Sequence, residues 1–231
     1  MGPNIPPLHL VGIELIYTLI IIIFCGIIYF KTKEIYDLSK HKGIGFFRNT
    51  FLFFALSYLV RFLGQLFILY RSILHISMRR FIIKPHFVIF PLITYFSYVA
   101  ILSLVFSSFR KTKKTNINWN LVIHLLAIIS TFFVFLSGSA MILIGLQFAL
   151  FIVAIVLINI KPKNKKNKSM FSSLHVTYYL LFFFWIINLF SFERGPTSFI
   201  LNSLLNIFSI IIFYSITHRV IKRLSNVQKK G

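Results

Sequence analysis

Acidic residues are almost absent from this sequence, which holds four of them among 231 residues: Glu14, Glu34, Asp37 and Glu193. General acid–base catalysis needs titratable side chains held in place, and no pair of carboxylates lies inside an apolar segment here. The sequence also lacks the HExxH motif of metalloproteases and the GxSxG nucleophile elbow of α/β-hydrolases. We therefore expect a protein that is not an enzyme.

Cysteine is equally scarce, and the single one, Cys25, lies inside an apolar run. One cysteine excludes an intramolecular disulfide. His124, His175 and His218 fall toward the same ends of three apolar segments, but no cysteine or carboxylate stands near them in the sequence to complete a metal site. We expect neither a metal nor another cofactor.

Charged residues make up 13% of the chain and hydrophobic residues 58%. Soluble domains carry about a quarter charged and about half apolar residues, so this composition indicates a membrane protein. The formal net charge of +21 comes from short basic runs between apolar segments. Anionic lipid headgroups are the counter-charge that fits such runs, and we expect no nucleic-acid partner.

Seven apolar runs are long enough to cross a bilayer, which takes about 20 helical residues. None shows the apolar–polar alternation of a membrane strand, so the sequence predicts an all-α, polytopic membrane protein with seven transmembrane helices. The predicted spans are 11–30, 46–70, 84–109, 118–137, 139–160, 171–192 and 198–219. Together they form one transmembrane domain, 1–219, followed by a basic tail, 220–231. The shortest link, "SGSA" at 137–140, predicts an antiparallel hairpin of the fourth and fifth helices.

The distribution of Lys and Arg predicts the orientation of these helices. One side of the membrane collects 19 of them, in the segments 31–48, 110–114, 161–168 and 219–230, and the other side collects five, in 71–84 and at Arg194. The positive-inside rule puts the first set in the cytoplasm, so the N-terminus is expected outside and the C-terminus inside. The sequon at Asn167 then lies in the cytoplasm and is not glycosylated. We expect a multi-pass integral protein of the plasma or cell membrane.

Arg61 stands near the middle of the second predicted span, within "FALSYLVRFLGQLF". An arginine at that depth costs roughly 2.5–3.5 kcal/mol to insert, and such residues usually face the bundle interior with a partner. The same helical face carries Ser57, Tyr58, Gly64 and Gln65, at i−4, i−3, i+3 and i+4, which makes a polar stripe on an apolar helix. Glu14, near the outer end of the first helix, is the expected partner, and Glu193 is the second choice. The pair has two interpretations, a structural clamp between helices 1 and 2 or the holder of an anionic ligand.

Uncharged polar residues in the later helices extend this candidate site. They are Gln147 in the fifth helix, Asn188 in the sixth, and Asn202 and Asn206 in the seventh, with Ser209 on the face of the last two. Hydrogen bonds between helices explain such residues as well as a binding pocket does. The full candidate set for a ligand-binding or polar network is Glu14, Ser57, Arg61, Gln65, Gln147, Asn188, Asn202 and Asn206.

Seven helices in this orientation resemble two families by helix count and topology alone, the microbial rhodopsins and the SWEET-type sugar transporters. A retinal protein needs a Schiff-base lysine in the seventh helix, and "FILNSLLNIFSIIIFYSITH" contains none. For a transporter, helices 1–3 and 5–7 form parallel triplets joined by helix 4, and "YFKTKE" and "NIKPKN" share a K-x-K at the inner ends of helices 1 and 5. Against it, Pro91 in the third helix has no counterpart in the seventh.

The sequence thus favours a receptor or sensor-like membrane module whose polar patch around Arg61 binds a small polar or anionic ligand. Because the chain carries no effector domain, a signal would pass to a separate cytoplasmic partner. The alternatives are a small-solute transporter of 3+1+3 helix architecture and a structural membrane scaffold.

Overall fold

The computed structural model describes residues 8–40, 42–74, 86–107, 118–160, 168–192 and 199–228. Within these ranges the chain is helical and contains no strand. Its seven helices are α1 (Leu8–Ser39), α2 (Lys42–Ile73), α3 (His86–Ser107), α4 (Trp119–Ser137), α5 (Ala140–Ile160), α6 (Lys168–Phe192) and α7 (Phe199–Gln228). The all-α fold class is as predicted.

The helices follow the predicted apolar runs, and α1 and α7 extend furthest beyond them. α1 continues to Ser39 and α7 to Gln228, so most of the predicted basic tail is a continuation of the last helix. Beyond the apolar run of α1, Lys31 and Glu34 form an ion pair at 3.3 Å, and Asp37 and Lys40 form another at 3.6 Å. The first pair lies within α1 at i,i+3 spacing, which supports a helix in water. Hydropathy marks where a helix leaves the apolar layer, whereas helical hydrogen bonding continues past that point.

The link between α4 and α5 consists of Gly138 and Ser139. Gly138 adopts a left-handed conformation, with φ of 60°, and its backbone N–H donates to the carbonyl of Val134 at 3.2 Å. This closes α4 in the way that glycine closes many helices. α4 and α5 contact each other as expected for a hairpin, and each also packs against α3.

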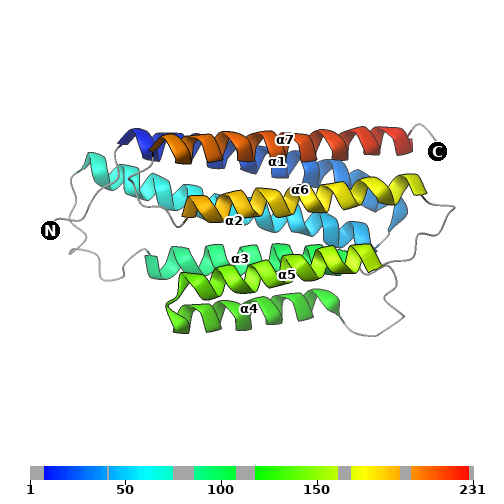
Figure 1. Ribbon diagram of the computed structural model, residues 1–231, viewed down its shortest axis with the longest axis horizontal. Helices are drawn as coiled ribbons and strands as arrows, with labels where there is room; N and C mark the ends of the chain where they lie inside the picture. The colour runs from blue at the N-terminus through cyan, green and yellow to red at the C-terminus, as the bar shows by residue number, and fades with distance from the viewer. Residues whose placement is uncertain are drawn as a thin grey trace.

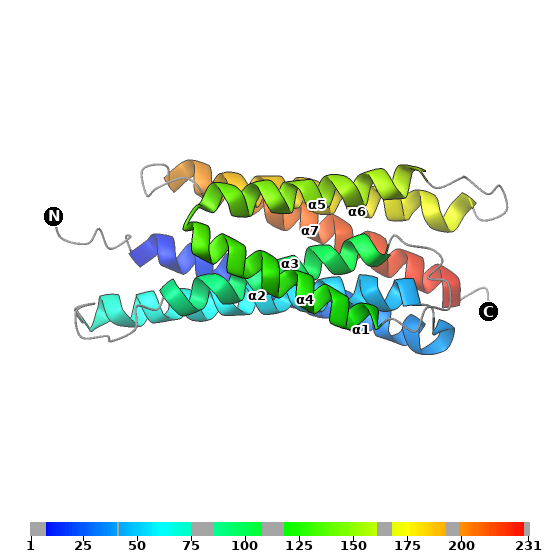
Figure 2. The same cartoon turned by 90° about the horizontal axis from the view of Figure 1, so that it is seen from below.

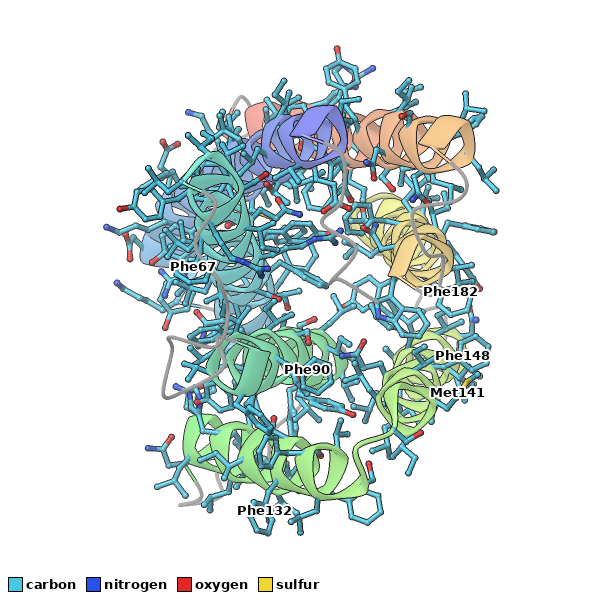
Figure 3. The ribbon with its side chains drawn as sticks, turned by 90° about the vertical axis from the view of Figure 1, so that its left-hand side faces the viewer. Phe67, Phe90, Phe132, Met141, Phe148 and Phe182 are labelled. Carbon is cyan, nitrogen blue, oxygen red and sulfur yellow. The ribbon has the colours of Figure 1, made fainter. Side chains whose placement is uncertain are left out.

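Six of the helices form a closed ring. α1 packs against α2, α2 against α3, α3 against α5, α5 against α6, α6 against α7, and α7 against α1. Figure 3 looks along the helices and shows this ring, with α4 lying outside it against α3 and α5. Phe132 of α4 points away from the ring. Within the described residues the backbones of α2 and α6 do not come close together, and their side chains meet across the interior.

Successive helices run in opposite directions (Figures 1 and 2), so α1, α3, α5 and α7 all begin at the same end of the bundle. We call that end the amino end and the opposite one the carboxyl end. α1–α3 form the first half of the ring and α5–α7 the second half, with α4 connecting them from outside.

Aromatic side chains fill the interior of the ring. Phe213 of α7 contacts Phe51 of α2 and Phe184 of α6 edge-to-face, with ring centroids 6.3 and 4.8 Å apart. All three are buried, and we call them the aromatic layer. Edge-to-face aromatic pairs add about 0.5–1.5 kcal/mol to the stabilisation from area burial.

The outer surface of the bundle is apolar, with exposed side chains such as Ile16, Leu63, Ile129 and Phe208 on different helices. Six helices are long and apolar enough to cross a membrane, namely α1 to α5 and α7. In α6 the described apolar segment is Val176–Asn188, which is shorter. Large apolar surfaces on a monomer mark contact with lipid or protein, and these helices indicate a membrane-embedded, multi-pass protein.

Candidate functional site

Arg61 forms the expected ion pair with Glu14. Nη2 of Arg61 lies 3.2 Å from Oε1 of Glu14, and the side chains are 23% and 36% exposed. Nε2 of Gln65, one turn further along α2, donates to Oε2 of the same carboxylate. The i,i+4 spacing of Arg61 and Gln65 brings both to α1, since residues four apart lie on one face of a helix. We call these three residues the Glu14 triad.

A second polar group joins four helices in the ring interior. Oδ1 of Asn188 in α6 accepts hydrogen bonds from the hydroxyls of Tyr17 in α1, at 2.6 Å, and Tyr58 in α2, at 3.0 Å. Nδ2 of Asn188 donates to the Phe184 carbonyl at 2.8 Å and to Oγ of Ser209 in α7 at 3.3 Å. We call Tyr17, Tyr58, Asn188 and Ser209 the Asn188 cluster.

The cluster and the triad are contiguous. Tyr17 follows Glu14 by three residues on α1, and Tyr58 precedes Arg61 by three residues on α2, so each pair shares a helical face. The two tyrosine hydroxyls also lie 3.3 Å apart. A continuous polar strip therefore leads from the partly exposed triad at the amino end to the buried cluster, and the aromatic layer closes the interior on the carboxyl side.

Gln147 belongs to a different polar group, between α3, α5 and α6. Its Nε2 donates to Oγ of Ser97 at 3.0 Å, and its Oε1 accepts from Nε1 of Trp185 at 2.9 Å. We call Ser97, Gln147 and Trp185 the Gln147 cluster. It satisfies both ends of a buried amide, as buried polar groups require.

The remaining predicted residues do not join one patch. Ser57 turns to α3, where its hydroxyl donates to the Ile93 carbonyl at 3.3 Å. Asn202 and Asn206 lie on α7, where Asn206 is buried. Oδ1 of Asn202 and Oγ of Ser203 are buried without a hydrogen-bond partner among the described residues. The eight predicted residues are therefore distributed over several helix pairs, because the two sides of one helix face different neighbours.

Glu193, the second choice as partner of Arg61, lies outside the described residues, as do Asn167 and Arg194. His124 binds the Tyr95 hydroxyl through Nδ1 at 2.7 Å, and His218 is exposed near the carboxyl end of α7. Within the part of the chain that the structure describes, no three His, Cys, Asp or Glu side chains come together as a metal site.

Sequence reasoning placed Tyr58 on the polar face of Arg61, but it missed Tyr17 and the hydrogen bonds of both tyrosines to Asn188. In a chain with 29 Phe and 10 Tyr, tyrosine on an apolar helix is indistinguishable from core by composition. Their position in the sequence is what indicates a polar role, because each lies one turn from a charged residue on the same helical face. Tyrosine has an apolar body and a polar tip, so it can line a core and still bond a central amide.

Comparison with known proteins gives one relative of similar length. The chain is 26% identical over 227 residues to an uncharacterized protein of Archaeoglobus fulgidus, covering 96% of this chain and 97% of that protein. No protein-family model matches the chain. No solved structure matches it either.

Proposed function

We propose that this chain is a carrier that moves a small polar solute across the membrane between its two three-helix halves. The observation that carries the proposal is the Asn188 cluster, in which the first half contributes Tyr17 and Tyr58 and the second half contributes Asn188 and Ser209. In transporters built from repeated halves, the substrate site lies near the bilayer midplane at the interface between the repeats.

The order of helices in the ring supports an internal two-fold relation. Exchanging α1 with α5, α2 with α6 and α3 with α7 leaves every neighbour relation of the ring unchanged, and exchanged helices run in the same direction. This is the arrangement of parallel repeats related by an axis along the membrane normal. α4 lies outside the ring, as a connector between two such halves would.

The residue pattern of two of the three helix pairs, α1 with α5 and α2 with α6, agrees with that relation at an offset of 130 residues. Lys31 and Lys33 correspond to Lys161 and Lys163 in the shared K-x-K. Six corresponding positions are buried in both halves: Tyr17 and Gln147, Ile21 and Phe151, Ile28 and Ile158, Phe47 and Thr177, Phe51 and Leu181, and Phe54 and Phe184. This correspondence outweighs the missing proline counterpart in the last helix.

Tyr58 and Asn188 correspond at the same offset, and they are hydrogen-bonded to each other across the ring at 3.0 Å. Equivalent positions of two repeats meet only near the axis that relates them. The Asn188 cluster therefore lies on the proposed axis, where a site must lie to be reached from either side when the halves tilt. The polar strip leads from it to the amino end, and the aromatic layer separates it from the carboxyl end.

The proposal includes seven spans with the N-terminus outside. α6 has 25 residues, about 37 Å at 1.5 Å per residue, and runs beside α5 and α7 along their length. The described basic residues gather at the carboxyl end, including Lys31, Lys40, Lys42 and Lys222, which the positive-inside rule puts in the cytoplasm.

The test is untargeted exchange in proteoliposomes loaded with a uniformly ¹³C-labelled metabolite extract, with the released compounds identified by mass spectrometry. We expect a chemically related group of polar solutes to leave wild-type vesicles and to be retained with Asn188→Ala. Asn159→Ala is the matched control, because that amide binds Tyr179 at the exposed side of α5 and α6. Release equal to that of protein-free vesicles would contradict carriage. Binding of a solute without its release would favour the receptor interpretation. If the protein neither binds nor releases a solute, the scaffold interpretation is favoured.

A further inference from the structure

The Glu14 triad contains an unused hydrogen-bond acceptor. Nε2 of Gln65 donates to Glu14, while Oε1 of the same amide is buried with no hydrogen-bond partner among the described residues. A buried acceptor left unpaired costs about 1–3 kcal/mol. A primary amide can exchange its oxygen and nitrogen by rotating half a turn, so Gln65 is able to present either group to the carboxyl.

This property suits a carboxyl group that exists in two protonation states. An ionised Glu14 accepts from the Gln65 N–H and from Arg61, as the structure shows. A protonated Glu14 has an O–H to donate, and the rotated Gln65 offers Oε1 to receive it. The same three side chains thus satisfy both states, whereas a purely structural clamp needs only the ionised one.

Arg61 has capacity to bind a second anion. The guanidinium carries five N–H donors, and the hydrogen bond to Glu14 uses Nη2 only. The side chain is 23% exposed, so the protein does not cover the whole guanidinium. An anion that displaces Glu14 leaves a carboxylate unpaired in a low-dielectric environment, which is unfavourable unless a proton binds at the same time.

Arg61 is the charged side chain that the structure pairs with Glu14. α2 supplies Arg61 and Gln65 to Glu14, and the neighbouring Tyr17 and Tyr58 are neutral phenols. On α7, the other helix packed against α1, the described side chains with a basic group are His218, Arg219 and Lys222, all near the carboxyl end. Arg71 lies beyond Gln65 by six residues on α2, and His9 of α1 lies outside the described side chains.

We infer that Glu14 is a proton-binding site and that Arg61 binds the anionic group of the solute when Glu14 is protonated. This inference rests on the proposed carrier and names its substrate class, a small organic anion bearing a second polar group that reaches the Asn188 cluster. One proton enters with one negative charge, so the coupled movement is electroneutral. The proton comes from water at the amino end, moves to a Glu14 oxygen as the anion replaces that oxygen at Arg61, and returns to water when the anion leaves.

Infrared difference spectroscopy of the full chain in lipid tests the inference without a transport assay. Acidification over about pH 7 to 3, which spans the ordinary titration of a carboxyl group, should produce a carboxylic-acid C=O band that is lost in Glu14→Gln. In Gln65→Leu the band should move to higher frequency, because the acid O–H loses its acceptor. Glu34→Gln, which changes an exposed carboxyl paired with Lys31 at the carboxyl end, is the control that keeps the band.

Gluconate and inorganic phosphate are the anion probes, added at constant pH. We expect at least one of them to increase the Glu14 band in the wild type and in Arg61→Lys, and neither to do so in Arg61→Met. If Glu14→Gln retains the band, or if neither probe increases it in the wild type, the inference is wrong. An equal increase in Arg61→Met also contradicts it. If solute is released in the exchange assay but neither anion increases the Glu14 band, the carrier proposal stands and the proton-binding inference is wrong. If an anion increases the Glu14 band but no solute is released, the carrier proposal alone is wrong.

Discussion

Asn188 joins α1, α2, α6 and α7 through hydrogen bonds. Its carbonyl oxygen accepts from two tyrosine hydroxyls, and its amide nitrogen donates to Ser209 and to the Phe184 carbonyl. Removing the amide leaves both hydroxyls without that acceptor in the ring interior. Unpaired donors in a low-dielectric interior are costly, so this residue ties the two halves together in the observed state.

Asn188→Leu should therefore lower the stability of the purified protein in mild detergent. We expect a loss of about 2 kcal/mol, since two buried donors lose a partner, each worth about 1 kcal/mol. Asn159→Leu, which removes one bond at the exposed face, should change stability by less than about 0.5 kcal/mol. Denaturation midpoints of the two variants beside the wild type provide the measurement. Equal effects would show that the Asn188 cluster does not hold the halves together.

Among single residues, the sequence predicted the ion pair of Arg61 with Glu14 and named Tyr58, Asn188 and Ser209 as polar candidates, but it did not predict Tyr17 or the hydrogen bonds that join the four residues. The sequence holds only four acidic residues that could pair with this arginine, and one of them, Glu14, lies at a suitable depth on the preceding helix. Tyrosine is common in apolar cores, so the sequence does not require a polar partner for Tyr17 or Tyr58. The ligand role of the predicted residues stays a prediction.

At the scale of elements, helix positions follow from apolar runs, and helix ends follow from local backbone chemistry. Gly138 ends α4 with φ of 60° because glycine has no Cβ to oppose the left-handed conformation. Lys40 adopts a similar conformation, with φ of 49°, after α1. The extensions of α1 and α7 were not predicted, since hydropathy does not record helical residues that stand in water.

Gly138→Ala should destabilise the α4–α5 link by about 1 kcal/mol, the cost of a left-handed conformation for a residue with a Cβ. Gly145→Ala is the matched control on the same helix pair. A Cβ at Gly145 meets no atom within 4 Å, and alanine favours a helix over glycine. Thermal midpoints in detergent should fall for the first variant and rise or stay unchanged for the second. The reverse order would contradict the turn geometry.

At the scale of the whole molecule, the ring order of the helices was beyond the sequence. Hydrophobic periodicity tells which residues are buried, but in a bundle surrounded by lipid it does not say which helix covers them. Pro91, which has no counterpart in the last helix, counted against the 3+1+3 interpretation. The closed ring with α4 outside it counts in favour of that interpretation. The pairing of Tyr58 with Asn188 needed the fold, because only there do positions 130 residues apart meet.

The number of spans determines whether the two ends of the chain lie on the same side of the membrane. We expect a fluorescent protein fused after Gly231 to be fluorescent in cells and alkaline phosphatase fused there to be inactive, with the opposite pattern at the N-terminus. Seven spans place the termini on opposite sides, whereas a sixth helix that does not cross places them on the same side. Reporter activities that agree at both ends would therefore contradict the proposed topology.

Access to Ser209 from the two sides of the membrane is the measurement that tests the carrier most directly. Ser209 is 1% exposed in the observed state, so a membrane-impermeant thiol reagent reaches a cysteine there only when the bundle opens. The experiment uses Ser209→Cys in a Cys25→Ala background, with the reagent added separately to the outside and to the inside of oriented vesicles. Lys33→Cys at the carboxyl end and Tyr70→Cys at the amino end serve as one-sided controls, since both positions are exposed.

We expect Ser209→Cys to react from both sides while each control reacts from one, because a carrier site opens to each side in turn. Reaction from the amino end alone would contradict carriage and support a receptor, and no reaction from either side would support a scaffold.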